Sequence, residues 1–176
     1  MHTKALSTSI LSRHPAIFLL LSLLLLGSAL FAISRPAHAD EDTIKVVYHA
    51  DFADPRRFSS MLTSINNMIT YYQDELVEYD VRIVFNAHGI RYVTDDKLSK
   101  TPFAEDKALA ERRENIKGRM LSLHKVQNVK LELCDITRSQ IGLAADKLYS
   151  GVDQVPSGVV RVAELQHQGF AYIKVE

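Results

Sequence analysis

The chain of 176 residues has the length of one domain, and its 47% hydrophobic and 24% charged residues are typical of a globular protein. A single cysteine excludes an intramolecular disulfide, an iron–sulfur cluster held by several thiolates and any zinc site that needs two cysteines. The first 39 residues carry three basic residues and no acidic one, which leaves 18 basic and 21 acidic residues beyond them. This acidic excess argues against a basic surface, so we expect no nucleic-acid partner.

The first 39 residues have the pattern of a secretory signal peptide. Basic residues precede an apolar run over residues 16–33, and Ala37-His38-Ala39 supplies the small residues of a signal-peptidase site. We therefore predict cleavage before Asp40, a domain over residues 40–176 and no membrane association after cleavage. An uncleaved anchor is the alternative, since about 18 apolar residues can just span a bilayer. The lone cysteine and the absence of Asn-x-Ser/Thr sites favour a bacterial periplasm.

Beyond the signal, strand and helix patterns alternate. The β-branched run 43–49 predicts a strand, and Asp54-Pro55 supplies an N-cap and a first-turn proline for a helix. Apolar residues recur at helical spacing from Phe58 to Leu76, which predicts one buried face. Residues 80–87 predict a second strand, which ends at His88-Gly89.

The second half continues the alternation. Thr101-Pro102 repeats the capped helix start, residues 128–133 predict a strand that runs into Cys134, and residues 136–149 predict a helix that stops at Gly151. The remainder predicts a short strand, a short helix and a closing strand, over residues 152–155, 157–168 and 170–175. This order predicts an α/β fold with three layers, in which helices cover both faces of a mostly parallel five-stranded sheet.

Three predicted strands end in side chains suited to chemistry. His49 and Asp51 follow the first strand, His88 the second and Cys134 the third. Ligands of open α/β sheets bind beyond the carboxyl ends of the strands, so these residues form one candidate site if the strands are neighbours. Free N–H groups of the following helix favour a thiolate at Cys134, whereas Asp135 opposes it unless it is turned away. His88 is the candidate cationic partner of the thiolate, and a buried inert cysteine is the alternative.

Several segments carry a resemblance to a known family: residues 45–49, Ala87-His88-Gly89, residues 131–134 and, most specifically, residues 155–160 and 164–174. They resemble the DsrE/DsrF-like sulfur-relay proteins. The resemblance implies a five-stranded sheet between helices, assembly into homotrimers or hexamers, and a cysteine that accepts sulfane sulfur as a persulfide. Cys134 matches that cysteine. The three residues after it are Asp135-Ile136-Thr137, where the exported branch of the family usually has Gly-Asn-Thr.

Together with the predicted export, the resemblance implies a periplasmic sulfur carrier whose partner is a sulfur donor or acceptor protein, or a small sulfur compound. Cys134 is then the sulfur acceptor and needs no cofactor, and no glycine-rich phosphate loop, GxSxG, HExxH or CxxC motif points to other chemistry. The expected ligand-lining residues lie at the ends of the strands, and Arg91 among them is expected to attract anionic sulfur compounds: His49, Asp51, Gly89, Arg91, Asp135 and Thr137.

Two other classes of function remain open from the sequence. One is a binding or assembly module of the same fold, in which Cys134 is a packing residue. The other is a copper or zinc site made of His49, His88 and Cys134, with Asp51 as a possible fourth ligand.

Overall fold

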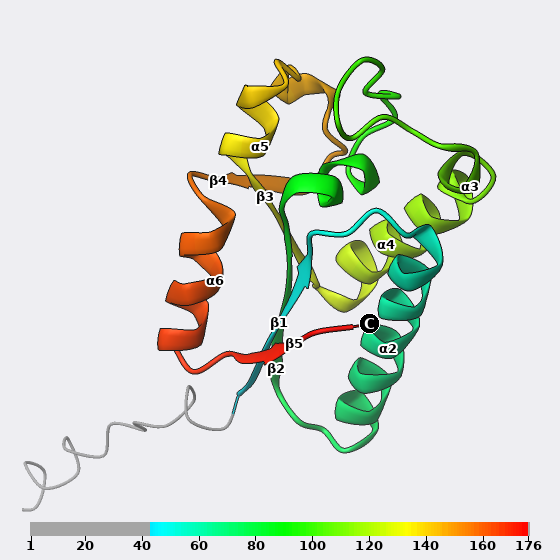
Figure 1. Ribbon diagram of the computed structural model, residues 1–176. Helices are drawn as coiled ribbons and strands as arrows, with labels where there is room; N and C mark the ends of the chain where they lie inside the picture. Colours follow the sequence, from blue (N-terminus) through cyan, green and yellow to red (C-terminus); the bar gives the residue numbers. More distant parts are fainter. Residues whose placement is uncertain (1–42, 176) are drawn as a thin grey trace, which may run out of the picture. The chain divides into compact units, whose positions relative to one another are not determined.

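Residues 43–175 form a five-stranded parallel sheet flanked by helices in the computed structural model (Figure 1). The strand order is β4-β3-β2-β1-β5, and every neighbouring pair is parallel. The strands are β1 (Ile44–Ala50), β2 (Tyr79–Phe85), β3 (Lys130–Cys134), β4 (Val152–Val155) and β5 (Ala171–Ile173). The predicted three-layer α/β/α fold is therefore confirmed. The predicted signal peptide and its cleavage site lie outside the described residues.

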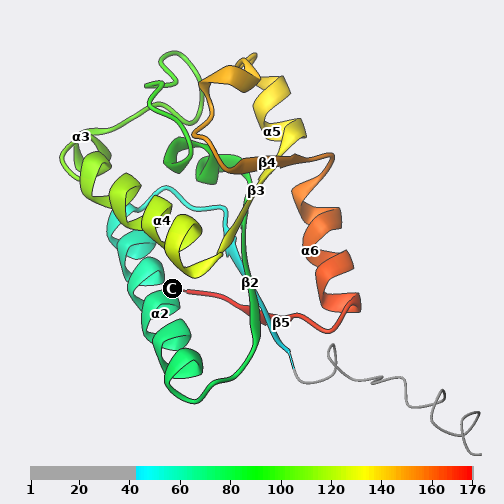
Figure 2. The same ribbon diagram turned by 180° about the vertical axis from the view of Figure 1, so that it is seen from behind.

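Helices cover the two faces of the sheet unequally (Figures 1 and 2). One face packs against α2 (Pro55–Asp74) and α4 (Arg113–Gln127), with the short α3 (Lys107–Ala110) before α4. The other face packs against α6 (Gly158–His167), which contributes Val162 and Leu165 to a small apolar cluster. The short α5 (Asp135–Gln140) begins directly where β3 ends.

The start of α2 follows from local sequence. The Asp54 carboxylate accepts hydrogen bonds from the N–H groups of Arg56 and Arg57, at 2.8 and 3.4 Å, and Pro55 occupies the first turn. The predicted apolar face is buried through Phe58, Met61, Leu62, Ile65 and Ile69. Each such side chain stabilises the fold by about 1.5–3 kcal/mol relative to an exposed position.

The prediction that a second capped helix begins at Thr101-Pro102 was wrong. Thr101-Pro102 lies in a turn, where the Thr101 hydroxyl donates to the carbonyl of Leu98 and accepts from the N–H of Phe103, at 2.8 and 3.1 Å. A threonine bonded within its own turn offers the backbone an alternative to a helix. The helical segment instead begins after Asp106, whose carboxylate accepts from the N–H of Leu109 at 2.8 Å.

Two further predicted bounds differ from the structure. The helix expected over residues 136–149 ends at Gln140, because Gly142 adopts a left-handed conformation (φ +69°), and a short 3₁₀ turn, η3 (Ala145–Lys147), follows. Strand β2 ends at Phe85, two residues before the predicted end. Ala87 there has a φ of +45° and opens a 3₁₀ helix, η2 (Ala87–Tyr92), so the chain leaves the sheet early.

Candidate functional site

The first three strands are neighbours, so their carboxyl ends meet at one edge of the sheet. Val84 of β2 packs in the cluster under α6, and Glu132 of β3 binds Arg161 of α6. Because side chains alternate along a strand, Asn86 and Cys134 point to the same α6 side. Phe85 pairs with Leu133, which places Asn86 level with Cys134 on the adjacent strand. The candidate site therefore lies between the sheet edge and the starts of α5 and α6.

Cys134 is buried, with 6% of its surface exposed, but its sulfur lies among polar groups rather than in either apolar cluster. The groups that favour a negative charge on the sulfur are the backbone N–H of Gly158 at the start of α6, and the N–H groups of Ile136 and Thr137 with the Thr137 hydroxyl at the start of α5. Burial raises the pKa of the thiol, but these groups outweigh burial and lower the pKa below its usual value. The surroundings therefore favour the nucleophilic thiolate.

Thr137 links the end of β2 to the cysteine. Its hydroxyl oxygen accepts the N–H of Ala87 at 3.2 Å, which leaves the hydroxyl proton for the sulfur of Cys134. The residue is 8% exposed. Thr137, expected from the sequence to line a ligand site, lies next to the thiol and favours its ionised form.

Asp135, the acidic residue next to Cys134, is held in an ion pair within α5. The guanidinium group of Arg138 lies 2.7 Å from its Oδ1 in an ion pair on one face of α5. Arg138 also donates to the carbonyl of Leu143, which fixes the guanidinium. The acidic residue next to the cysteine is therefore neutralised locally.

His49 is half-buried at the end of β1 and belongs to a hydrogen-bonded series. Its Nε2 lies 2.8 Å from Nδ2 of Asn86, and its Nδ1 lies 3.4 Å from the hydroxyl of Tyr172 in β5. Burial lowers the pKa of His49, and the exposed Asp51 opposes this with a smaller effect. The neutral imidazole is therefore the favoured form near neutral pH.

Asn86 and Gly158 are site residues that sequence reasoning missed. A Cβ atom on Gly158 would lie 1.7 Å from Oδ1 of Asn86, so only glycine lets α6 approach the sheet this closely. Asn86 is 7% exposed, and its Oδ1 has no hydrogen-bond partner among residues 43–175. Two signals were available in the sequence: a polar residue directly after a buried strand, and a glycine directly after the helix-capping Ser157.

His88 contacts an aromatic ring, and among residues 43–175 no contact with Cys134 supports it as a cationic partner of the thiolate. Its ring meets Phe103 edge-on, with the ring centroids 5.2 Å apart, and within the described part of the chain it makes no hydrogen bond or ion pair with the thiol. Gly89 has a packing role, because a Cβ there would lie 1.9 Å from the carbonyl oxygen of Ala50. His88 and Gly89, expected as the thiolate partner and a ligand-lining residue, thus belong to the 3₁₀ helix after β2.

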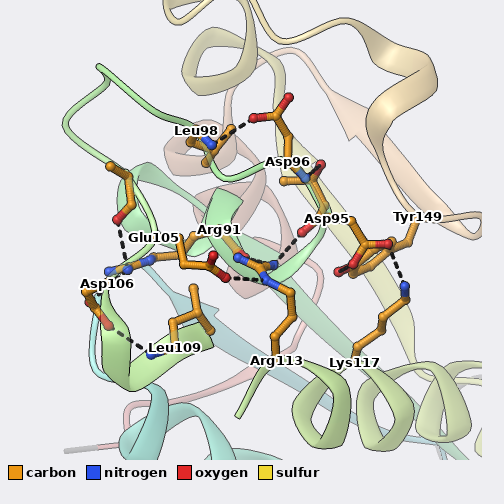
Figure 3. Close-up of polar contacts among 12 residues, drawn as sticks. Arg91, Asp95, Asp96, Leu98, Glu105, Asp106, Leu109, Arg113, Lys117 and Tyr149 are labelled. Carbon is orange, nitrogen blue, oxygen red and sulfur yellow. Dashed lines mark hydrogen bonds and ion pairs between the residues drawn. The ribbon is translucent and has the colours of Figure 1, made fainter. Parts of the chain in front are cut away.

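Arg91 is not available to attract an anion. The side chain is buried, and its guanidinium group binds Asp106 at 2.8 Å (Figure 3). It also donates to the carbonyls of Ala104 and Ala53, at 2.9 and 3.4 Å. Its charge is therefore neutralised inside the protein, where it fastens the loop before α3.

The alternative metal site does not assemble. Within residues 43–175, no three His, Cys, Asp or Glu side chains lie close enough together to hold a metal ion. His49, His88, Cys134 and Asp51 are therefore not a common ligand set. Of the helices in the same range, none is long and apolar enough to cross a membrane.

Fold and site together define a small parallel α/β domain with one cysteine at the carboxyl end of an inner strand. The sequence matches the family model of the DsrE/DsrF-like family over residues 28–175, and the chain belongs to this family. The family is one of sulfur relay, so membership associates the chain with sulfur handling at the level of the family.

Two solved structures are similar to this chain. One is a protein of unknown function, MTH1491, from Methanobacterium thermoautotrophicum, with 25% identity and a TM-score of 0.57 over 74% of this chain and 98% of that one. The other is the ychN protein from E. coli, with 20% identity and a TM-score of 0.47 over the same shares. The comparison with curated proteins gave no match.

Proposed function

We propose that the protein carries sulfane sulfur as a persulfide on Cys134. The observation that carries this proposal is the set of N–H and O–H donors around the sulfur from the starts of α5 and α6, which lower the pKa of a buried thiol. Membership of a sulfur-relay family supports the same assignment. An anionic sulfur is what both a nucleophilic thiolate and a stored persulfide require.

The transfer step needs only this thiol and a donor persulfide. The Cys134 thiolate attacks the outer sulfur of the donor, a new S–S bond forms to Cys134, and the donor's own S–S bond breaks. The donor leaves as a thiolate with the bonding electron pair, so charge is conserved and no other oxidant is consumed. A second thiolate then removes the outer sulfur from Cys134 in the same way.

Intact mass spectrometry tests the carrier proposal directly. After exposure to a polysulfide donor, we expect the wild type to gain about 32 Da and to lose it on treatment with dithiothreitol. Cys134→Ser is the matched control and should gain nothing. Since the chain has one cysteine, any gain in the wild type is assigned to one atom. A wild type that stays at its original mass would contradict the proposal.

The 6% exposure of Cys134 favours a second candidate, a binding module without sulfur chemistry. Alkylation with iodoacetamide separates the two. A sulfur carrier reacts in the folded state, and faster than a free thiol at pH 6, whereas a packing cysteine reacts only after unfolding in urea. Local opening of the first turns of α5 and α6 would give the reagent access in the first case.

We also propose export to the periplasm with cleavage before Asp40. The basic start, the apolar run and the Ala37-His38-Ala39 sequence support this proposal. Sequencing of the protein recovered from a periplasmic fraction should begin at Asp40. Recovery of the full-length chain in the membrane fraction would favour the uncleaved anchor.

We further propose that the domain forms a homo-oligomer, a trimer or a hexamer. Exposed apolar side chains near the site support an association surface: Ile136 at 48%, Val159 at 70% and Val160 at 53%. Light scattering coupled to gel filtration would give the mass in solution. A monomer at all concentrations tested would contradict this proposal.

A further inference from the structure

The strongest unexplained group in the site is the carboxamide of Asn86. The residue is 7% exposed, yet its Oδ1 has no hydrogen-bond partner among residues 43–175. An unpaired buried polar atom costs about 1–3 kcal/mol, so such an atom calls for a partner. The carboxamide lies against Gly158, whose N–H favours a negative charge on the sulfur of Cys134, and Asn86 is level with Cys134 in the sheet. It therefore borders the space around the sulfur.

The partner of Asn86 decides which atom of the carboxamide faces that space. If His49 carries its proton on Nδ1, then Nε2 accepts from Nδ2 of Asn86 and Oδ1 is left unpaired. If His49 carries its proton on Nε2, then Nε2 donates to Oδ1, the Tyr172 hydroxyl donates to Nδ1, and the Asn86 N–H groups turn toward Gly158. In the second arrangement Oδ1 of Asn86 is paired with His49, and the N–H groups of Asn86 can donate to an anionic sulfur.

We propose that Asn86 is a ligand-facing amide that donates an N–H to an anionic sulfur held at Cys134, and that His49 and Tyr172 keep it in that orientation. The anion is the thiolate in the empty protein and the outer sulfur in the loaded one, and this second part rests on the proposed function. The outer sulfur lies about 2.05 Å from the first one, beyond the N–H groups that bind the inner sulfur, so it needs a donor of its own. Asn86 supplies this donor from the adjacent strand.

Thiol titration tests the proposal without any sulfur donor. The rate of alkylation of Cys134 as a function of pH gives the thiol pKa of the folded protein. We expect Asn86→Ala to raise this pKa by about one unit, which is tenfold less thiolate at a pH below it, and Asn86→Asp to raise it further by adding a negative charge. Asn115→Ala, at an exposed position of α4, is the matched control and should leave the pKa unchanged. An unchanged or lowered pKa in Asn86→Ala overturns the proposal.

The His49 tautomer provides a second test in the unmodified protein, so the result does not depend on a variant that folds. Nitrogen NMR of labelled histidine should show the proton on Nε2 of His49 once Cys134 is ionised, with the side-chain N–H resonances of Asn86 shifted in the same step. A proton on Nδ1 together with unmoved Asn86 resonances overturns the proposal.

The two proposals fail separately. A wild type that gains no sulfur removes the carrier function, while the titration and the tautomer still decide the role of Asn86. If the wild type does gain sulfur, Asn86→Ala should lose it to dithiothreitol at a clearly different rate, because the charge on the outer sulfur then has no N–H donor from Asn86. Equal rates of loss in the two proteins would overturn the role of Asn86 toward the outer sulfur and leave the carrier function standing.

Discussion

The two faces of the sheet differ in what they bury. On the side of α2 and α4, the inward strand residues are all apolar and join one large cluster: Val46, Tyr48, Ala50, Val81, Ile83, Phe85, Leu131 and Leu133. On the side of α6, charged side chains lie next to a smaller apolar cluster. This cluster has five members: Val47, Val84, Val162, Leu165 and Phe170. Hydrophobic burial is thus concentrated on the first face, while the polar groups and the thiol lie on the second.

A buried ion network replaces apolar packing on the α6 face. Glu132 accepts from Arg82 at 2.9 Å and from Arg161 of α6 at 2.7 and 2.9 Å. Arg82 also pairs with Asp80 at 2.7 Å. Glu132 precedes Cys134 by two residues, and Arg161 follows Gly158 by three. The network therefore fastens the first turn of α6, beside the thiol, to strand β3.

The largest expected effect comes from the apolar face. Phe58→Ala removes a fully buried ring that stacks on Tyr92 with centroids 4.0 Å apart. We expect the free energy of unfolding in urea to fall by about 3–5 kcal/mol, with the thiol pKa unchanged. Val162→Ala, in the small cluster under α6, should cost about 1.5 kcal/mol. Equal losses of unfolding free energy in Phe58→Ala and Val162→Ala would mean that hydrophobic burial is not concentrated on the face of α2 and α4.

Glu132→Gln should come next in magnitude. Arg161 loses its buried countercharge and Arg82 keeps only Asp80, so we expect a loss of about 3 kcal/mol in the free energy of unfolding. Glu114→Gln, at an exposed position of α4, is the control and should change little. A free energy of unfolding equal to that of the wild type would mean that the ion pairs of Glu132 do not stabilise the fold.

The same carboxylate makes stability depend on pH. Burial raises the pKa of Glu132, but the hydrogen bonds from Arg161 and Arg82 outweigh it and lower the pKa below its usual value. A carboxyl group with a lowered folded-state pKa stabilises the protein fully above its unfolded pKa of about 4.3 and loses this contribution as the pH falls through the folded value. The acid-induced loss of stability should therefore be smaller in Glu132→Gln than in the wild type.

Gly158→Ala should have a moderate effect on stability and a clear one on the thiol. The added Cβ meets Oδ1 of Asn86, which displaces the start of α6 at a cost of about 1–3 kcal/mol and withdraws an N–H from Cys134, so the thiol pKa rises. Gly118→Ala is the control: its Cβ meets open space in α4, and it should stabilise by about 0.5–1 kcal/mol. If the clash is the cause, Asn86→Ala in the same chain should recover part of the lost stability.

The smallest expected effect is that of Arg138→Gln. The partly exposed ion pair with Asp135 should contribute less than about 1 kcal/mol to stability. Without Arg138, the free carboxylate next to Cys134 disfavours the thiolate, so alkylation at neutral pH should slow down. Asp135→Asn should have the opposite effect on the rate. Identical rates in both variants would show that this carboxylate does not act on the sulfur.

Sequence patterns were sufficient where one segment decides its own structure. The strand runs, the apolar face of α2 and the position of Cys134 before a helix are local features, and all three are present. Asp54-Pro55 and Thr101-Pro102 look alike, but a buried helical face follows only the first pair directly. A capping residue followed by proline therefore specifies a helix only where apolar residues at helical spacing come directly after it.

The residues that were misassigned or missed depend on distant partners. Arg91 reads as a free cation in a loop, and its partner Asp106 comes 15 residues later. The role of Asn86 depends on a helix from the far end of the chain, because Gly158 must reach the end of β2. Such contacts follow from strand order and register, which no single segment encodes.

The strand order has a consequence for how the chain reaches its native state. β1 and β5 are the most distant strands along the chain, yet they pair, and Tyr172 of β5 completes the hydrogen-bonded series to His49. Until β5 docks, one side of β1 presents unpaired backbone groups to any other extended chain, which is a route to aggregation. Docking of β5 therefore completes the hydrogen-bonded series to His49 and protects that edge of β1 in one step.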